Sequence, residues 1–176
     1  MISDRLIWRV EQQADYLEKR WARMLREHPA TEHYHNFNDE YLQRSIREVY
    51  RHLSEYIEDA HSAEQLAGLF MDIGRQRKTQ GVPLHELAFA IILARKNIWN
   101  FIMEEETFSS ALKFHQMNEF WQRVMNFFDK NIYFVVHGFI KEPEEAEDST
   151  DVISKYIHAF SLGSLPEVNK RALSEQ

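Results

Sequence analysis

The sequence predicts an all-α protein, an antiparallel bundle of four to five helices followed by a short C-terminal amphipathic helix. Apolar residues recur at spacings of three and four along most of the chain, which is the period of a helix with one buried face. Only 5 glycines and 4 prolines occur in 176 residues, which disfavours a β architecture rich in turns. A hydrophobic content of 44% is sufficient for the packed core of one domain.

The first helix is expected over residues 4–28, with Asp4 as its cap. It should end before Pro29, because the residue that precedes a proline is disfavoured in the α region. Residues 30–38 are expected to form a loop. The candidate caps for the next helix are Asn36, Asn38 and Asp39.

The second helix is expected to extend to about residue 61, and a third should begin after Ser62. Ser62 and Gln65 have the spacing of a capping box, in which side chains satisfy the first backbone N–H groups of a helix. The third helix should end at Gly81, which can adopt the left-handed conformation that closes a helix. Pro83 suits the start of the following helix, where its missing N–H costs nothing. The chain is therefore predicted to form an αα-hairpin at this point.

The fourth and fifth helices are the most apolar. The fourth, over residues 84–105, is apolar on more than one face, so it should lie centrally and pack on several neighbours. The fifth, from Ser109 or Ser110 to Lys141, carries two apolar stripes, which need partners on two sides, as an additional helix or a dimer would supply. The side chains expected to serve helix packing or dimerisation are Phe120, Trp121, Phe127 and Phe134.

Three regions follow from this pattern. Residues 1–141 are expected to form the bundle, residues 142–151 an acidic hinge, and residues 152–176 a short amphipathic helix and a tail. So short a helix is not stable alone, and it should dock on the bundle, on a second copy or on another protein. Together with the two stripes of the fifth helix, it favours a homodimer. The docking side chains would be Ile153, Tyr156 and Phe160.

The composition disfavours several kinds of site and partner. Without cysteine, the chain has no disulfide, thiolate zinc site or iron–sulfur cluster. A net charge of −7 with dispersed basic residues disfavours nucleic-acid binding, which normally uses a clustered basic face. No secretion signal is visible, and the longest apolar run, residues 87–94, is too short to cross a membrane. We expect a cytoplasmic protein without membrane contact.

Histidines are the candidates for a metal or haem site. His33 and His35 form a pair in a loop, but a closed zinc site needs three or four ligands, so no metal is expected. His115 and His137 belong to the fifth helix, whose aromatic residues could line a haem pocket. The more frequent alternative is a core or interface histidine that makes an ordinary hydrogen bond. No cofactor is therefore predicted.

Arginines flank the predicted hairpin on both sides. Arg77 and Arg95 are candidate ligand-binding residues, because two guanidinium groups on adjacent helices could converge on one carboxylate or phosphate. The more common alternative is a structural ion network, in which these arginines and Arg75 pair with internal acids. The candidate acids are Asp72, Glu86 and Asp129.

The sequence contains no recognisable catalytic constellation. Carboxylates of the second helix are interspersed with Arg47 and Arg51, as on a solvated face, and Glu55 and Glu58 lack the histidine of a di-iron motif. A nucleophile elbow, a P-loop and a dinucleotide-binding fingerprint are all absent from the sequence. We expect a protein that is not an enzyme.

Three segments resemble the RsbRD N-terminal domain family. Residues 74–102 carry a Gly-Arg-x-Arg helix end, the connection Gln-Gly-Val-Pro-Leu and an apolar helix up to Trp99. The other two segments are residues 127–139 (FFDKNIYFVVHGF) and, more weakly, residues 21–29. Together they span about residues 5–140. All three are packing and turn patterns.

The resemblance implies a helical input module of bacterial stress regulators and of some sensor histidine kinases, usually paired with a second copy. Longer members continue into an output domain, whereas the acidic hinge and one short helix follow the bundle here. We therefore expect a non-catalytic input or adaptor module that contacts a separate kinase or scaffold protein. The alternative is a sensor that binds a small molecule or haem.

Overall fold

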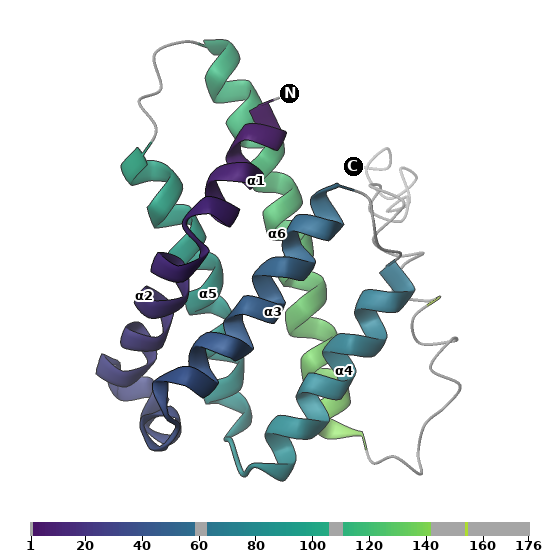
Figure 1. Cartoon of the computed structure of the whole chain (residues 1–176). Helices are drawn as coiled ribbons and strands as arrows, with labels where there is room; N and C mark the ends of the chain where they lie inside the picture. The colour runs from purple at the N-terminus through teal and green to yellow at the C-terminus, as the bar shows by residue number, and fades with distance from the viewer. Residues whose placement is uncertain (1, 59–62, 106–110, 142–153, 155–176) are drawn as a thin grey trace, which may run out of the picture. The chain divides into compact units, whose positions relative to one another are not determined.

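The computed structural model describes residues 2–58, 63–105, 111–141 and 154. Figure 1 labels the six α-helices in these ranges, and a 3-10 helix, η1, lies between α2 and α3. Their bounds are α1 (Ile2–Gln12), α2 (Ala14–Glu27), η1 (Pro29–Asn36), α3 (Asp39–Ile57), α4 (Ala63–Thr79), α5 (Leu84–Glu105) and α6 (Ala111–Ile140). No strand occurs in the described ranges, so the all-α prediction is confirmed. All seven elements belong to one unit, Met1–Glu142.

The first predicted helix is interrupted at Gln13. Gln13 has φ −108° and ψ 19°, outside the helical region, and separates α1 from α2. Its backbone remains hydrogen-bonded on both sides, to the carbonyl of Arg9 (3.1 Å) and the amide of Leu17 (3.0 Å). The prediction of one continuous helix is therefore wrong. The apolar spacing continues across a break of one residue, which is why the pattern did not reveal it.

The segment after α2 is more regular than the predicted loop. It forms η1, two short 3-10 pieces with a kink at Thr31 (φ −134°, ψ 39°). The buried Thr31 hydroxyl donates to the carbonyl of Leu25 (2.7 Å) and anchors the kink. Of the three candidate caps, Asn38 is the one that caps α3, by accepting a hydrogen bond from the amide of Tyr41 (2.8 Å). Helix α3 ends at Ile57, a few residues earlier than expected, and the predicted cap Ser62 lies outside the described residues.

Helix α5 packs on α2, α6 and η1, whereas α6 contacts four helices, α1, α3, α4 and α5, so α6 rather than α5 has the most neighbours. Two neighbouring helices direct polar side chains at α5. The indole N–H of Trp21 on α2 donates to the carbonyl of Ala90 (3.0 Å), and the hydroxyl of Tyr50 on α3 donates to Ala94 (3.3 Å). From α5 itself, the amide of Asn97 donates to the carbonyl of Leu17 (2.8 Å) and to the Tyr50 hydroxyl (2.9 Å). These bonds fix α2 and α3 against α5.

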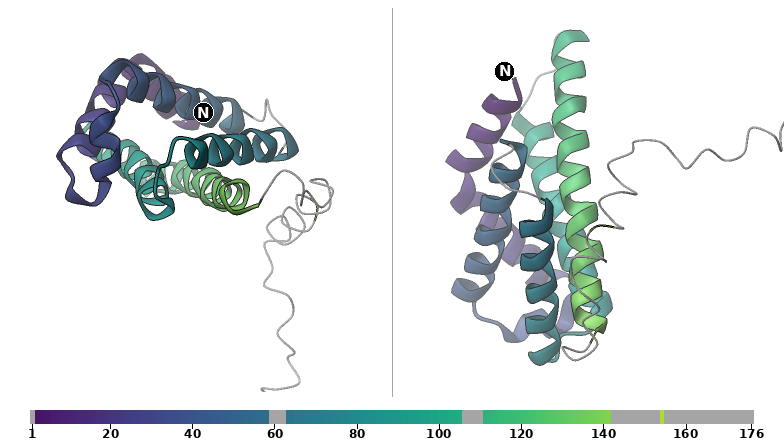
Figure 2. Two further views of the ribbon diagram at one scale, coloured as in Figure 1. Left: turned by 90° about the horizontal axis from the view of Figure 1, so that it is seen from below. Right: turned by 90° about the vertical axis from the view of Figure 1, so that its right-hand side faces the viewer.

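Helices α4 and α6 pack side by side at very short range, as Figure 2 shows. Two glycines permit the approach. A Cβ atom on Gly74 would overlap the backbone of Val135, and one on Gly138 would overlap the backbone of Met71. The helices therefore touch through their main chains at two levels.

The heptad stripe of α6 is buried inside the single chain. Phe120, Phe127 and Phe134 are all nearly inaccessible to solvent, and the ring of Phe127 contacts those of Tyr56 (5.6 Å between centroids) and Phe70 (5.4 Å). Trp121 is half-buried, with its ring 4.4 Å from that of Trp99. These four residues thus serve packing within the bundle. The homodimer stays a prediction.

Candidate functional site

The turn after α4 holds Arg77 in place. Gly81 has φ +75°, in the left-handed region, as the sequence predicted. The amide of Val82 donates to the carbonyl of Arg77 (3.1 Å), and the amide of Gly81 donates to that of Lys78 (2.9 Å). This pair of bonds is the Schellman motif, which closes a helix at a glycine. Since Val82 is buried, the turn also anchors the C-terminal end of α4 to the core.

The Arg77 side chain turns inward from this helix end and is only 7% exposed. Its guanidinium donates to the hydroxyl of Tyr41, the side-chain oxygen of Gln80 (2.7 Å) and the hydroxyl of Ser45 (3.0 Å). It also lies over the Tyr41 ring, 5.1 Å from the centroid, where a cation is attracted to the π face. All three hydrogen-bond acceptors are uncharged.

Arg77 has no ion-pair partner among the residues that the structure describes. The buried carboxylate of Glu86 accepts a hydrogen bond from the amide of His33 (2.9 Å) instead. Burial raises the pKa of the nearby Tyr34 hydroxyl far above its usual value, and the charge of Arg77 partly opposes that shift. Tyr34 therefore stays neutral at physiological pH and supplies no counter-charge.

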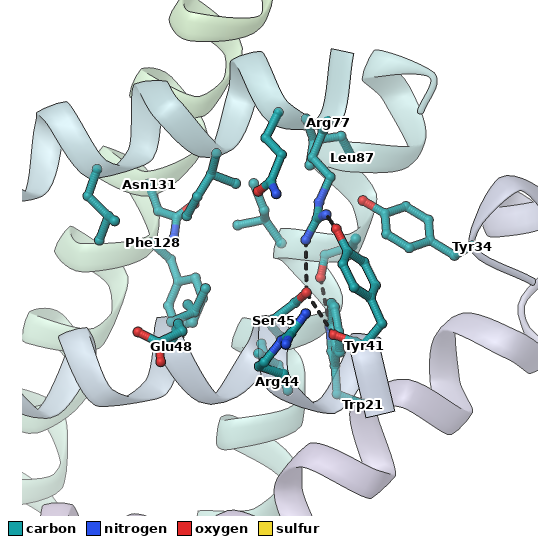
Figure 3. Close-up of a pocket in the computed structure, with 18 residues that line it drawn as sticks. Trp21, Tyr34, Tyr41, Arg44, Ser45, Glu48, Arg77, Leu87, Phe128 and Asn131 are labelled. Atoms are coloured by element: carbon teal, nitrogen blue, oxygen red, sulfur yellow. Dashed lines mark hydrogen bonds between the residues drawn. The ribbon is translucent and has the colours of Figure 1, made fainter. Parts of the chain in front are cut away.

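A pocket of about 300 Å³ opens beside Arg77, between helices α3, α4, α5 and α6 (Figure 3). Its walls are largely apolar, and the polar groups that line it come mainly from three helices. These polar residues are Tyr41, Arg44, Ser45 and Glu48 on α3, Gln76 and Arg77 on α4, and Asn131 on α6. The pocket thus combines an apolar interior with a small number of convergent polar groups, as small-molecule sites do.

Asn131 is the second unusual polar group of this pocket. It is 1% exposed, and its amide nitrogen has no hydrogen-bond partner in the described part of the chain. A buried N–H without an acceptor costs roughly 1–3 kcal/mol. Nearly all buried polar groups in proteins are paired, so an unpaired donor in a pocket wall is a candidate ligand contact.

The other candidate arginines lie elsewhere. Arg95 is 3.5 Å from Asp129, and Arg75 is 2.6 Å from Asp72; in both ion pairs the carboxylate is exposed rather than internal. Neither lines the pocket with Arg77. Of the three arginines singled out from the sequence, only Arg77 faces the cavity.

The candidate histidines are also outside the pocket wall. His115 is an exposed residue 3.3 Å from Glu119, and the ring of His137 stacks on that of Tyr133 with centroids 6.2 Å apart. In the loop pair, His33 contacts the carbonyl of Gln80 and His35 that of His28, each at 3.3 Å. No group of three or more His, Asp or Glu residues in the described ranges is arranged to hold a metal ion.

Tyr41, Ser45 and Asn131 are site residues that the sequence analysis did not identify. Tyr41 and Ser45 stand four residues apart, so both lie on the face of α3 that meets Arg77. Asn131 follows the buried pair Phe127 and Phe128 and is itself buried in α6. The sequence could have pointed to Asn131, because it is a polar residue within the apolar face of a helix.

Four large apolar side chains are exposed on helices that meet toward one end of the bundle, while Tyr133 and Ile140 are exposed further along α6. Trp8 on α1 is 57% exposed and Phe114 on α6 is 61% exposed; Tyr16 on α2 and Met103 on α5 are exposed as well. Figure 1 shows α1, the C-terminal half of α5 and the N-terminal half of α6 at this same end. We call Trp8, Tyr16, Met103 and Phe114 the end surface. The other predicted contact residues, Ile153, Tyr156 and Phe160, lie outside the described residues.

None of the described helices is both long and apolar enough to cross a membrane. Comparison with curated proteins and with solved structures gave no match. A family model described as the RsbT co-antagonist protein rsbRD N-terminal domain matches residues 15–151, well over half of the chain. This match confirms the resemblance seen in the turn and helix patterns. The chain belongs to the RsbRD N-terminal domain family.

Proposed function

We propose that the chain is a non-catalytic input module of a stress-signalling regulator, and that it acts by contact with a separate regulatory protein. The family match carries this proposal, because the family description names a co-antagonist, a protein that acts jointly with another against RsbT. The contact is with a kinase or scaffold protein rather than with nucleic acid.

The end surface is the contact site in this proposal. Large aromatic residues and methionine are enriched in protein interfaces. Trp8 and Phe114 both expose more than half of their surface, and they lie on two helices, α1 and α6, that contact each other. Tyr16 and Met103 extend the apolar area over α2 and α5, where the Tyr16 and Phe101 rings lie 6.4 Å apart. The stripe Phe120, Phe127 and Phe134, by contrast, is already buried within the chain.

Site-specific photocrosslinking in the native cell tests this contact. A photoreactive phenylalanine analogue is placed at Phe114, and the control places it at Ile140, which has the same 61% exposure on the same helix. The proposal predicts that position 114 captures one regulatory protein and that position 140 does not. The purified captured protein should then bind the purified chain, and Phe114→Ser should weaken that binding. Equal capture at both positions, or capture only of a second copy, contradicts the proposal.

A second candidate function is small-molecule sensing, which the pocket beside Arg77 favours. A cavity of about 300 Å³ is at the lower end of the range for ligand sites. No described histidine lines it, so an imidazole ligand for haem is missing from its wall. We take the ligand in this second function to be a small organic molecule, which the largely apolar walls would contact.

A further inference from the structure

The charge of Arg77 is only partly compensated within the protein. A buried cation is costly unless it is paired and hydrogen-bonded. Tyr41, Ser45 and Gln80 provide three acceptors for the five N–H groups of the guanidinium, and none of these acceptors carries a charge. These bonds use three of the five N–H groups, and no Arg77 nitrogen is among the fully buried atoms without a partner, so the other two N–H groups remain open to water or to a ligand. An anion in the adjacent pocket would supply both the acceptors and the missing charge.

The other charged residues that line the pocket also favour an anion. Glu48 lines it, but its carboxylate accepts a hydrogen bond from Arg51 (2.6 Å). Arg44 lines it as well, with its guanidinium 6.0 Å from the Tyr41 ring and no ion pair among the described residues. The lining residues thus carry an excess of positive charge, and the buried carboxylate of Glu86 lies near Tyr34 but does not line the pocket.

The apolar wall between the polar groups favours a ligand that has an apolar body. The side chains that form it are Leu69 and Ile73 on α4, Leu87 and Ile91 on α5, and Phe128 on α6. A phosphate or a dianion would leave these surfaces without an apolar partner and would bring two charges to one buried guanidinium. A monocarboxylate with a hydrocarbon or aromatic body matches both the walls and the charge.

Asn131 adds a second requirement. Its amide nitrogen comes from α6, whereas Arg77 comes from α4, and Figure 3 shows the two side chains as separate parts of the lining. An uncharged oxygen on the ligand, such as a hydroxyl or carbonyl, would satisfy this donor. The pocket would then offer one contact for the carboxylate and another for the neutral oxygen.

We infer that this pocket binds a small amphipathic monocarboxylate that also carries one neutral oxygen acceptor. Arg77 binds the carboxylate, Asn131 donates to the neutral oxygen, and the apolar walls contact the body between them. The inference rests on the second candidate function, small-molecule sensing, and names its ligand class. It does not depend on protein contact at the end surface.

Isothermal titration calorimetry on the full chain tests the ligand class. The probes are 3-phenylpropanoate, 3-(4-hydroxyphenyl)propanoate, octanoate and 8-hydroxyoctanoate, each compared with its carboxamide. We expect saturable binding of at least one hydroxylated carboxylate, and about tenfold weaker binding of its carboxamide, because a charged hydrogen bond to Arg77 is lost. Equal affinity for carboxylate and carboxamide, or no saturable binding of any probe, overturns the inference.

Two variants assign the contacts. Asn131→Leu should abolish the preference for the hydroxylated probe, about fivefold, while it leaves the fold intact because it removes an unpaired buried donor. Arg77→Gln should abolish the preference for the carboxylate, and Arg75→Gln, on the same helix but paired with Asp72, should retain it. If Asn131→Leu binds both probes as the wild type does, the role of Asn131 is wrong. Failure of these titrations would leave the crosslink at position 114 unaffected, so the two proposals fail separately.

Discussion

Tyr50 is a buried polar residue whose hydroxyl links two helices. It donates to the carbonyl of Ala94 and accepts from the amide of Asn97, and all three groups lie in the core. Tyr50→Phe should lower the free energy of unfolding by about 1–2 kcal/mol, because Asn97 then loses one of its two acceptors. Urea unfolding at neutral pH measures this loss. An unchanged free energy of unfolding would contradict the assigned network.

The same residue predicts a pH dependence. Burial raises the pKa of Tyr50 well above the ordinary value of 10.0. Above that value the unfolded chain releases the proton while the folded chain retains it, so the free energy of unfolding falls as pH rises. The stability difference between the wild type and Tyr50→Phe should therefore be constant below about pH 9 and shrink by roughly 1 kcal/mol towards about pH 11. A difference that does not change over this interval would show that Tyr50 ionises equally in both states.

Glu18 and Arg47 form an ion pair with unequal burial. The carboxylate of Glu18 is 1% exposed and accepts two hydrogen bonds from Arg47, at 2.9 and 2.6 Å. Arg47→Met would leave this carboxylate buried without its cation, so it should destabilise the fold more than the double variant Glu18→Gln/Arg47→Met. Arg51→Met is the matched control, because its partners Glu48 and Glu55 both remain accessible to solvent and should lose little. Equal melting temperatures for Arg47→Met and the double variant would contradict the burial of Glu18.

At the scale of single residues, the sequence predicted the structural roles that depend only on residues nearby in the chain. The cap at Asn38 and the left-handed Gly81 are of this kind, because each acts on residues within one turn. Arg77 was identified as a ligand candidate, but its contacts Tyr41 and Ser45 were not, since they lie more than thirty residues away in the chain. The unpaired donor of Asn131 is likewise visible only after the helices have packed.

Among the elements, the contact between α4 and α6 is the most sensitive to side-chain size. Gly74→Ala and Gly138→Ala should each destabilise the protein by about 2 kcal/mol or more, because a methyl group would force the two backbones apart. Gly68→Ala on α4 is the control: nothing lies within 4 Å of its added Cβ, so it should stabilise the helix by roughly 0.5–1 kcal/mol. Thermal unfolding of the three variants measures the contrast. Similar effects at all three positions would contradict the close packing.

The ends of helices were predicted best where a glycine or a proline marks them in the sequence. Helix α5 has the predicted bounds. It follows the Gly81–Pro83 turn, and the spacing of its apolar residues identifies it as a helix rather than a strand. The break at Gln13 was missed, since neither glycine nor proline marks it and the apolar spacing continues on both sides. Packing against neighbouring helices, rather than the helix propensity of the local residues, determines where such a break occurs.

At the scale of the whole molecule, the homodimer expected from the double stripe of α6 needs a different surface. The Phe120, Phe127 and Phe134 stripe is buried in one chain, so a dimer must use side chains that remain exposed. We predict a dimer in sedimentation experiments with the purified chain. A monomer mass at every concentration tested would contradict it.

The central claim is that this family member receives or passes on a stress signal through its end surface. The most direct measurement is the stress-dependent output of native cells that carry Phe114→Ser or Ile140→Ser in place of the wild-type chain. Both residues are 61% exposed on α6, so neither change should unfold the protein. The claim predicts that Phe114→Ser alters the stress response and that Ile140→Ser does not. A wild-type response in the Phe114→Ser cells, with the protein folded and present at normal levels, would contradict it.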